Sequence, residues 1–172
     1  MQTLAARLAR GDETAFAELY DACADRLLAY LTARLGSRDR ASDVVQETFL
    51  RAVASRRWFA KVENPVAYLF QIARNEAKRL MARERQQPPS KLIADEILKS
   101  NDGRANRERT ELATAALNRI ASDDRELVEL KVFAGLTFRE IADITGLPQG
   151  TVASRYRRAL VELRPWLTKQ LS

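Results

Sequence analysis

Residues 136–160 read LTFREIADITGLPQGTVASRYRRAL, and this stretch decides the fold of the C-terminal part of the chain. Thr137 and Glu140 have the spacing of a capping box, in which a hydroxyl and a carboxylate each accept a hydrogen bond from a free amide at a helix start. Gly146 suits the left-handed conformation that ends a helix, and Pro148 suits the first turn of the next helix. The stretch therefore predicts two short helices joined by a tight turn, a helix-turn-helix.

The second of these helices has two chemically different faces. Apolar side chains repeat with helical spacing on one face, and polar or basic side chains lie on the other. The outward set consists of Gln149, Thr151, Ser154, Arg155 and Arg158. Arginine can offer two parallel hydrogen bonds to guanine, and a helix-turn-helix places such a helix in the major groove of DNA. The alternative is a helical hairpin whose basic face is only solvated.

Charge is distributed unevenly along the 172 residues, which carry a net charge of +6. Residues 51–85 hold nine basic and three acidic side chains, and residues 148–172 hold five basic and one acidic. The segments before them, 1–50 and 107–147, are each slightly acidic. Each half of the chain could thus have one protein-facing and one nucleic-acid-facing side, or these charges could simply be solvated.

Several function classes are disfavoured by what the sequence lacks. It has one cysteine, Cys23, and no histidine, so a disulfide within the chain and a cysteine–histidine metal site are both excluded, and we expect no cofactor. No signal-peptide pattern and no run of ~18 apolar residues is present, so we expect a cytoplasmic protein without direct membrane insertion. Scattered carboxylates and the lack of a phosphate-binding glycine loop argue against an enzyme.

Helical spacing of apolar residues nearly everywhere predicts an all-α protein. The polar segment 86–106, which begins with Gln-Gln-Pro-Pro-Ser, predicts a flexible linker between two small helical domains, 1–85 and 107–172. In the first domain, capping signals predict helices at 12–36, 38–55 and 64–85, with a loop at 56–63. In the second, the spacing of Leu112, Ala116, Leu117 and Ile120 predicts one helix, and Ser122 is expected to cap the next. With the two helices of the helix-turn-helix this makes a four-helix unit.

Three groups of residues in the first domain are candidates for binding. The helix at 38–55 presents a mixed outward face that suits a protein partner or plain solvent, with Asp43, Gln46, Glu47, Leu50 and Arg51. The next helix presents a basic stripe with Arg74, Asn75, Lys78 and Arg79. Trp58 and Phe59 lie in the predicted loop near Lys61, where they could stack an unpaired base or, alternatively, plug the end of the helical bundle.

Four ordered motifs extend this interpretation: RGDETAFAELY at 10–20, SDVVQETFLRA at 42–52, NPVAYLFQIARN at 64–75, and the pair GLTFREIA and TVASR in the helix-turn-helix. In order and spacing the chain resembles the extracytoplasmic-function (group 4) sigma factors of bacterial RNA polymerase over nearly its full length. The resemblance implies a non-catalytic factor that binds core polymerase, recognises promoter DNA through two domains and helps to open the duplex. It also implies an anti-sigma factor as a further partner.

The resemblance assigns roles to the candidate residues. It places Asp43, Gln46, Glu47, Phe49, Leu50 and Arg51 against the clamp helices of the largest polymerase subunit. It places residues 58–63, including Trp58, Phe59 and Lys61, with Arg74, Asn75, Lys78 and Arg79, against the melted promoter element. It places Gln149, Thr151, Ser154, Arg155 and Arg158 on the upstream duplex element, and Leu130, Val132 and Phe133 near the flap of the second-largest subunit.

Two departures from the family pattern limit what can be transferred. Members often have an acidic residue near Arg79 and a serine where Pro148 stands, so a known promoter sequence cannot be carried over to this chain. The runner-up interpretation is a helix-turn-helix regulator that binds an operator, with residues 1–85 sensing a signal or dimerising. No ligand-pocket or phosphoacceptor signature supports it.

Overall fold

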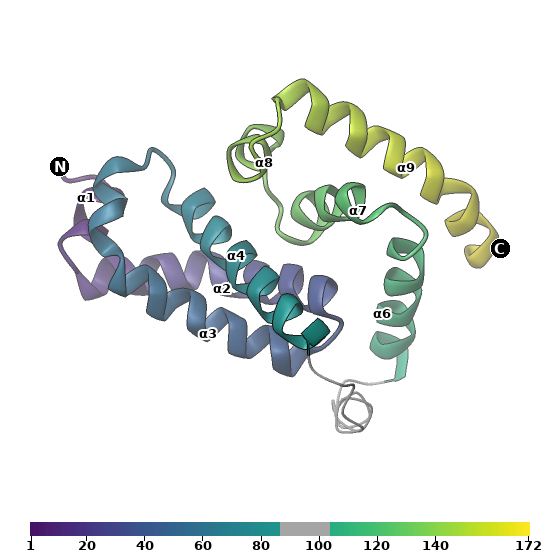
Figure 1. The fold of residues 1–172 in the computed structure, drawn as a ribbon, viewed down its shortest axis with the longest axis horizontal. Helices are drawn as coiled ribbons and strands as arrows, with labels where there is room; N and C mark the ends of the chain where they lie inside the picture. The colour runs from purple at the N-terminus through teal and green to yellow at the C-terminus, as the bar shows by residue number, and fades with distance from the viewer. Residues whose placement is uncertain (87–103) are drawn as a thin grey trace. The chain divides into compact units, whose positions relative to one another are not determined.

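A computed structural model describes residues 1–86 and 104–172 (Figure 1). The described residues form helices and turns with no strand, in two compact units, Met1–Ser90 and Lys91–Ser172. The predicted all-α fold with two helical domains is confirmed. The central part of the predicted linker, 87–103, lies outside the described residues.

The N-terminal unit is built on three long helices. Its elements are α1 (Leu4–Ala9), α2 (Glu13–Leu35), α3 (Arg38–Ala54), a short 3-10 helix η1 (Arg56–Lys61) and α4 (Pro65–Gln86). The α2, α3 and α4 helices all contact one another, and Figure 1 shows them side by side. Tyr30 of α2 and Phe70 of α4 are fully buried with ring centroids 6.2 Å apart, so aromatic and leucine side chains form the core between these helices.

The predicted boundaries of α2 are confirmed by their capping groups. The Asp12 carboxylate accepts hydrogen bonds from the backbone N–H groups of Thr14 and Ala15, at 2.9 and 3.2 Å. Gly36 ends the helix in the left-handed conformation, with φ of 71°. A hydrogen bond from Arg7 and these backbone donors hold the pKa of Asp12 below its ordinary value, which keeps the carboxylate charged as a cap.

The segment expected to be a loop at 56–63 is mostly the 3-10 helix η1. Phe59 causes the difference, because its fully buried ring makes edge-to-face contacts with Phe16, at 6.0 Å between centroids, and with Tyr68, at 5.0 Å. These contacts draw the backbone into a tight helical turn. Such turns depend on tertiary contacts, so a sequence without helical periodicity gives little sign of them.

The C-terminal unit contains the predicted four-helix arrangement. Its elements are α6 (Arg104–Leu117), α7 (Ser122–Val128), a π-helical continuation η2 (Glu129–Phe133), α8 (Phe138–Thr145) and α9 (Gln149–Leu171). The α9 helix packs on α6, α7 and α8. Leu127, Ile141 and Val152 are fully or almost fully buried and form part of the core beneath the helix-turn-helix.

The signals predicted for the helix-turn-helix are confirmed. Thr137 accepts a hydrogen bond from the Glu140 N–H and Glu140 accepts one from the Thr137 N–H, which completes the capping box. Gly146 ends α8 with φ of 76°. Pro148 takes the N-cap position, one residue before the first turn in which we expected it.

Ser122 does not cap α7 as predicted. The helix begins at Ser122 itself, Ala121 stands at the N-cap position, and no side-chain hydrogen bond caps the helix. Asp123 and Asp124 follow in the first turn, where carboxylates are stabilised by the helix dipole. The helix start therefore depends on its acidic residues rather than on the serine hydroxyl.

Candidate nucleic-acid interfaces

The α9 helix presents most of its predicted outward residues to solvent. Gln149, Ser154 and Arg158 are exposed, and Thr151 is half-buried. An edge-to-face contact between Phe138 of α8 and Tyr156 of α9, with centroids 5.5 Å apart, fixes the two motif helices together. The α9 surface is thus a rigid helix face carrying amide, hydroxyl and guanidinium groups, which is what major-groove recognition requires.

We expected the Arg155 side chain to point into solvent, but in the structure it is largely covered and hydrogen-bonded. Its side chain is 26% exposed, and its Nε donates to the Asp124 carboxylate on α7 at 2.7 Å. Arg158 donates to the other oxygen of Asp124 through Nη2 at 3.0 Å. Burial alone would raise the pKa of Asp124, but the hydrogen bonds from Arg158 and Arg155 outweigh it and the net pKa is lowered.

Two functional candidates on the C-terminal unit were missed by the sequence pattern. Arg157 is exposed beside the predicted set. Asp124 is 4% exposed, yet it binds two residues of the predicted DNA-binding set from 31 and 34 positions away. No local signal in the sequence identifies a partner so distant in the chain.

The basic stripe on α4 is confirmed as a solvent-facing surface. Asn75, Lys78 and Arg79 are exposed, and Arg74 is half-buried. Next to the stripe, α4 carries a buried residue that sequence reasoning missed, Glu76, which is 6% exposed. Its carboxylate binds Arg79 at 3.0 Å, so this arginine is balanced within the helix rather than being a free cation.

Glu76 also connects α4 to α3. Its Oε1 lies 2.6 Å from Nε of Arg51, and Arg51 in turn lies 3.1 Å from Glu47 of its own helix. Two residues expected to serve different partners, Arg51 and Arg79, therefore share one buried carboxylate. Because a carboxylate with two cations holds them in defined directions, the network orders both helix surfaces.

Trp58 and Phe59 separate into two different environments. Trp58 is 57% exposed, and the Lys61 ammonium lies over its ring at 4.7 Å from the centroid. Phe59 is fully buried, so the expectation that it binds melted DNA is wrong for this structure, and the alternative of an aromatic plug applies to it. An exposed indole with a cation beside it can stack a base while the cation meets a phosphate.

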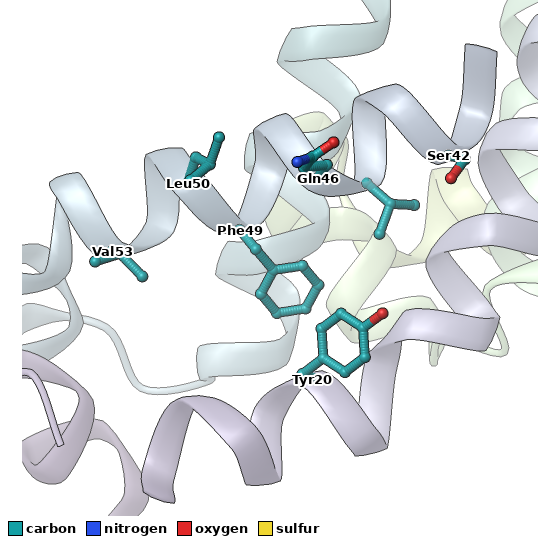
Figure 2. Close-up of a pocket in the computed structure, with 7 residues that line it drawn as sticks. Tyr20, Ser42, Gln46, Phe49, Leu50 and Val53 are labelled. Carbon is teal, nitrogen blue, oxygen red and sulfur yellow. The ribbon is translucent and has the colours of Figure 1, made fainter. Parts of the chain in front are cut away.

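A shallow groove runs along α3, between this helix and α2 (Figure 2). Figure 2 shows the Phe49 ring next to the Tyr20 ring, with Leu50 and Gln46 farther out on α3. The ring centroids are 5.0 Å apart, and Leu50 is 58% exposed. The lining residues are Tyr20, Ser42, Val45, Gln46, Phe49, Leu50 and Val53.

Three of the six residues predicted to bind polymerase line this groove. Gln46, Phe49 and Leu50 line it, while Asp43, Glu47 and Arg51 are other members of the same helix. Sequence reasoning missed Tyr20 and Val53, which are 51% and 44% exposed. The row Gln46, Phe49, Leu50 and Val53 has i, i+3, i+4, i+7 spacing, which was the available signal for a second apolar face.

Other kinds of site have no support among residues 1–86 and 104–172. No cluster of three or more acidic, cysteine or histidine side chains there could hold a metal ion. None of the helices in these ranges is long and apolar enough to cross a membrane.

One helical unit presents an exposed tryptophan with a lysine over its ring, and the other contains a helix-turn-helix. These features indicate the DNA-binding class of proteins. Comparison with known proteins agrees. The family model Sigma-70 region 2 matches residues 19–87, and the model Sigma-70, region 4 matches residues 110–163. The chain is 35% identical over 138 residues to the ECF RNA polymerase sigma factor EcfG of Rhodopseudomonas palustris, covering 80% of this chain and 76% of the relative.

A second relative and two solved structures extend the likeness over almost the whole chain. The ECF RNA polymerase sigma-E factor of Haemophilus influenzae is 32% identical over 171 residues, covering 92% of this chain and 90% of the relative. The fold is similar to CnrH, solved with the cytosolic domain of CnrY (TM-score 0.74, 24% identity, 96% of each chain covered). It is also similar to RpoE of Bartonella quintana, solved with NepR (TM-score 0.65, 24% identity, 92% and 98% covered).

The chain belongs to the extracytoplasmic-function RNA polymerase sigma factors. It is thus a factor that binds core RNA polymerase and directs promoter recognition and transcription initiation. The interpretation as an operator-binding regulator is not supported by these findings.

Proposed function

We propose that this sigma factor divides its work among three surfaces of its two units. The outward face of α9 binds the upstream duplex element of the promoter. The α4 stripe, together with Trp58, binds the melted element. The groove on α3 receives the clamp helices of core polymerase.

The observation that carries this proposal is the exposure of Trp58 at 57%, beside Lys61. More than half of the indole is open to solvent with a cation over its ring, so the ring is available to stack a base. Unpaired bases offer flat π-faces that paired bases hide, so Trp58 is suited to melted DNA and not to duplex DNA. The exposed ammonium group of Lys78 supplies attraction for the strand.

The α3 groove supports the polymerase assignment. Leu50 and Val53 are apolar and exposed, and the Phe49 and Tyr20 rings form the floor between the helices. Exposed apolar side chains with a polar rim of Gln46 and charged neighbours are typical of a protein-binding site. A helical partner could place its own apolar face in this groove.

Further parts of the proposal concern the setting in which the factor works. It has no catalytic activity of its own and acts in the cytoplasm beside the polymerase. The RpoE of Bartonella quintana was solved together with an anti-sigma factor, NepR, which supports an anti-sigma partner for this chain as well. Val132, which is 56% exposed on η2, is the best candidate for contact with the polymerase flap, whereas Leu130 is buried in the core.

Replacing Trp58 by Ala tests the division between duplex and melted DNA. Because Trp58 is largely exposed, the variant should fold, bind core polymerase and form a closed promoter complex, but opening should be impaired. Base–aromatic stacking contributes about 1–3 kcal/mol, so the yield of open complex should fall by roughly 5- to 150-fold. Permanganate footprinting of unpaired thymines measures this yield.

A promoter template that is mismatched across the start region is the control. It is already open, so it should restore much of the transcription lost by Trp58→Ala. If the variant opened the ordinary duplex as well as the wild type, or if the mismatched template restored nothing, base capture by Trp58 would be rejected.

A further inference from the structure

Asp124 lies on α7, outside the helix-turn-helix, yet it binds two arginines of the α9 surface. We propose that Asp124 is a positioning residue for promoter recognition. It fixes Arg155 before DNA arrives and restrains the positive charge of α9, so that this surface discriminates between sequences instead of binding any duplex. The inference rests on the proposed role of α9 in binding the upstream element.

The geometry leaves the base-reading end of Arg155 unused. Asp124 Oδ1 accepts a hydrogen bond from Nε of Arg155 at 2.7 Å, whereas guanine can be bound by the two terminal nitrogens of a guanidinium. Asp124 Oδ2 accepts from one terminal nitrogen of Arg158 at 3.0 Å. One carboxylate thus sets the direction of Arg155 without occupying its terminal fork.

Burial determines which of the two arginines stays bound. The Asp124 side chain is 6% exposed, and a buried carboxylate left without partners is strongly disfavoured. Arg155, at 26% exposure, is held against the domain, while Arg158, at 60%, can turn toward a phosphate. Arg155 therefore loses little conformational freedom when it meets a base, which favours the correct sequence.

Charge compensation adds to this selectivity. Binding to any duplex depends on how many phosphates the lysine and arginine side chains neutralise. A carboxylate in contact with two arginines weakens that general attraction, but it does not remove a directed contact with one base. Loss of Asp124 should consequently strengthen binding to unrelated DNA and weaken the preference for the correct sequence.

Asp123 provides a matched control, because it is the neighbouring residue in the first turn of α7 and is exposed. Asp123→Asn and Asp124→Asn change the net charge equally and at almost the same place. A difference between the two variants therefore reports the contacts of Asp124 rather than the total charge of the protein.

The experiment uses holoenzyme assembled from core polymerase and the full chain, as wild type, Asp124→Asn and Asp123→Asn. Wild-type holoenzyme first selects duplexes from a pool randomised over the upstream element. For each holoenzyme we then measure the ratio of affinities for the most enriched duplex and for a scrambled duplex of the same composition. The dependence of scrambled-duplex affinity on salt is measured in parallel.

We expect Asp124→Asn to lower the affinity ratio by about five-fold or more, the loss of roughly one base contact. The salt dependence for the scrambled duplex should steepen by about one to two phosphate contacts. Asp123→Asn should keep the wild-type ratio. An equal ratio in the two variants, whether unchanged or lowered, would overturn the positioning role of Asp124.

A different experimental result would contradict the proposed function itself. If wild-type holoenzyme enriched no sequence at the upstream element, the assignment of α9 itself would be wrong. If Asp124→Asn did not assemble into holoenzyme, Asp124→Glu would replace it, since this variant keeps the charge and moves the carboxylate by one methylene. We expect Asp124→Glu to lower the ratio at unchanged salt dependence, and a wild-type ratio would overturn the proposal.

Discussion

Trp58 and Phe59 are adjacent in the chain, but the first is exposed to solvent and the second is buried in the core. A 3-10 helix has three residues per turn, so neighbouring side chains point about 120° apart, and η1 sends Phe59 inward and Trp58 outward. Phe59 packs against Phe16 of α2 and Tyr68 of α4, which ties η1 to both helices. The exposed tryptophan is therefore held at a fixed place by its buried neighbour.

Phe59→Ala should destabilise the N-terminal unit by about 3–5 kcal/mol, because it removes a fully buried ring from between two other rings. Trp58→Ala should change the free energy of unfolding by no more than about 1 kcal/mol, since most of its ring is already in water. Urea unfolding of the full-length variants, followed by circular dichroism, compares the two. Similar losses for both residues would contradict the division of roles at η1.

At the scale of elements, single residues with strong local chemistry predict helix ends well. Asp12, Gly36, Thr137 with Glu140, and Gly146 all act at the positions that the sequence indicates. Features created by tertiary contacts leave no such signal. The π-helical η2 is an example, because its hydrogen bond from the Ala134 N–H to the Glu129 carbonyl widens the helix within a segment whose apolar residues still have α-helical spacing.

The predicted functional surfaces show the same contrast between local signals, which the sequence carries, and tertiary contacts, which it does not. The outward faces of α3, α4 and α9 are visible in the spacing of polar residues, so helical position predicts which of the candidate residues face solvent. The sequence does not show which of the arginines on these faces are already paired with a carboxylate. Their partners, Glu76 and Asp124, lie on other helices or other turns. Ion pairs between segments distant in sequence carry no periodic signal.

The turn between α8 and α9 gives a matched pair of substitutions. Gly146 has φ of 76° and Gly150 lies in the first turn of α9, and an added Cβ meets no atom within 4 Å at either position. Gly146→Ala should therefore cost about 1–2 kcal/mol through backbone strain alone. Gly150→Ala should stabilise by roughly 0.5–1 kcal/mol, because alanine favours the helix. Thermal melts of the two variants check the opposite signs, and a loss of stability in both would contradict this explanation.

At the scale of the whole molecule, the proposed protein-binding and DNA-binding surfaces lie on separate helices, and in the N-terminal unit the two helices share ionic contacts. In the N-terminal unit the groove on α3 is apolar, whereas α4 carries the exposed cations. Glu76 joins the two helices through Arg51, so a partner that displaces Arg51 would also alter the charge balance around Arg79. Polymerase binding and strand binding are thus in a position to influence each other within one unit.

Glu47→Lys tests whether the α3 surface binds polymerase rather than DNA. The exchange breaks an exposed i, i+4 ion pair with Arg51, which contributes about 0.3–0.5 kcal/mol, so the fold should persist. Reversing a charge at the rim of an interface should weaken co-elution with core polymerase in the absence of DNA. Asp25→Lys is the matched control, because it makes the same charge change at an exposed position of α2, outside the helix that carries the predicted polymerase-binding residues.

We expect Asp25→Lys to co-elute with core polymerase like the wild type and Glu47→Lys to co-elute less, most clearly at low salt, where rim charges act most strongly. Native circular dichroism of both variants establishes that the fold is intact. Adding promoter DNA should not restore co-elution of Glu47→Lys, because the lost contact is with protein. Unchanged co-elution of a natively folded Glu47→Lys variant would remove the Glu47 position of α3 from the polymerase interface.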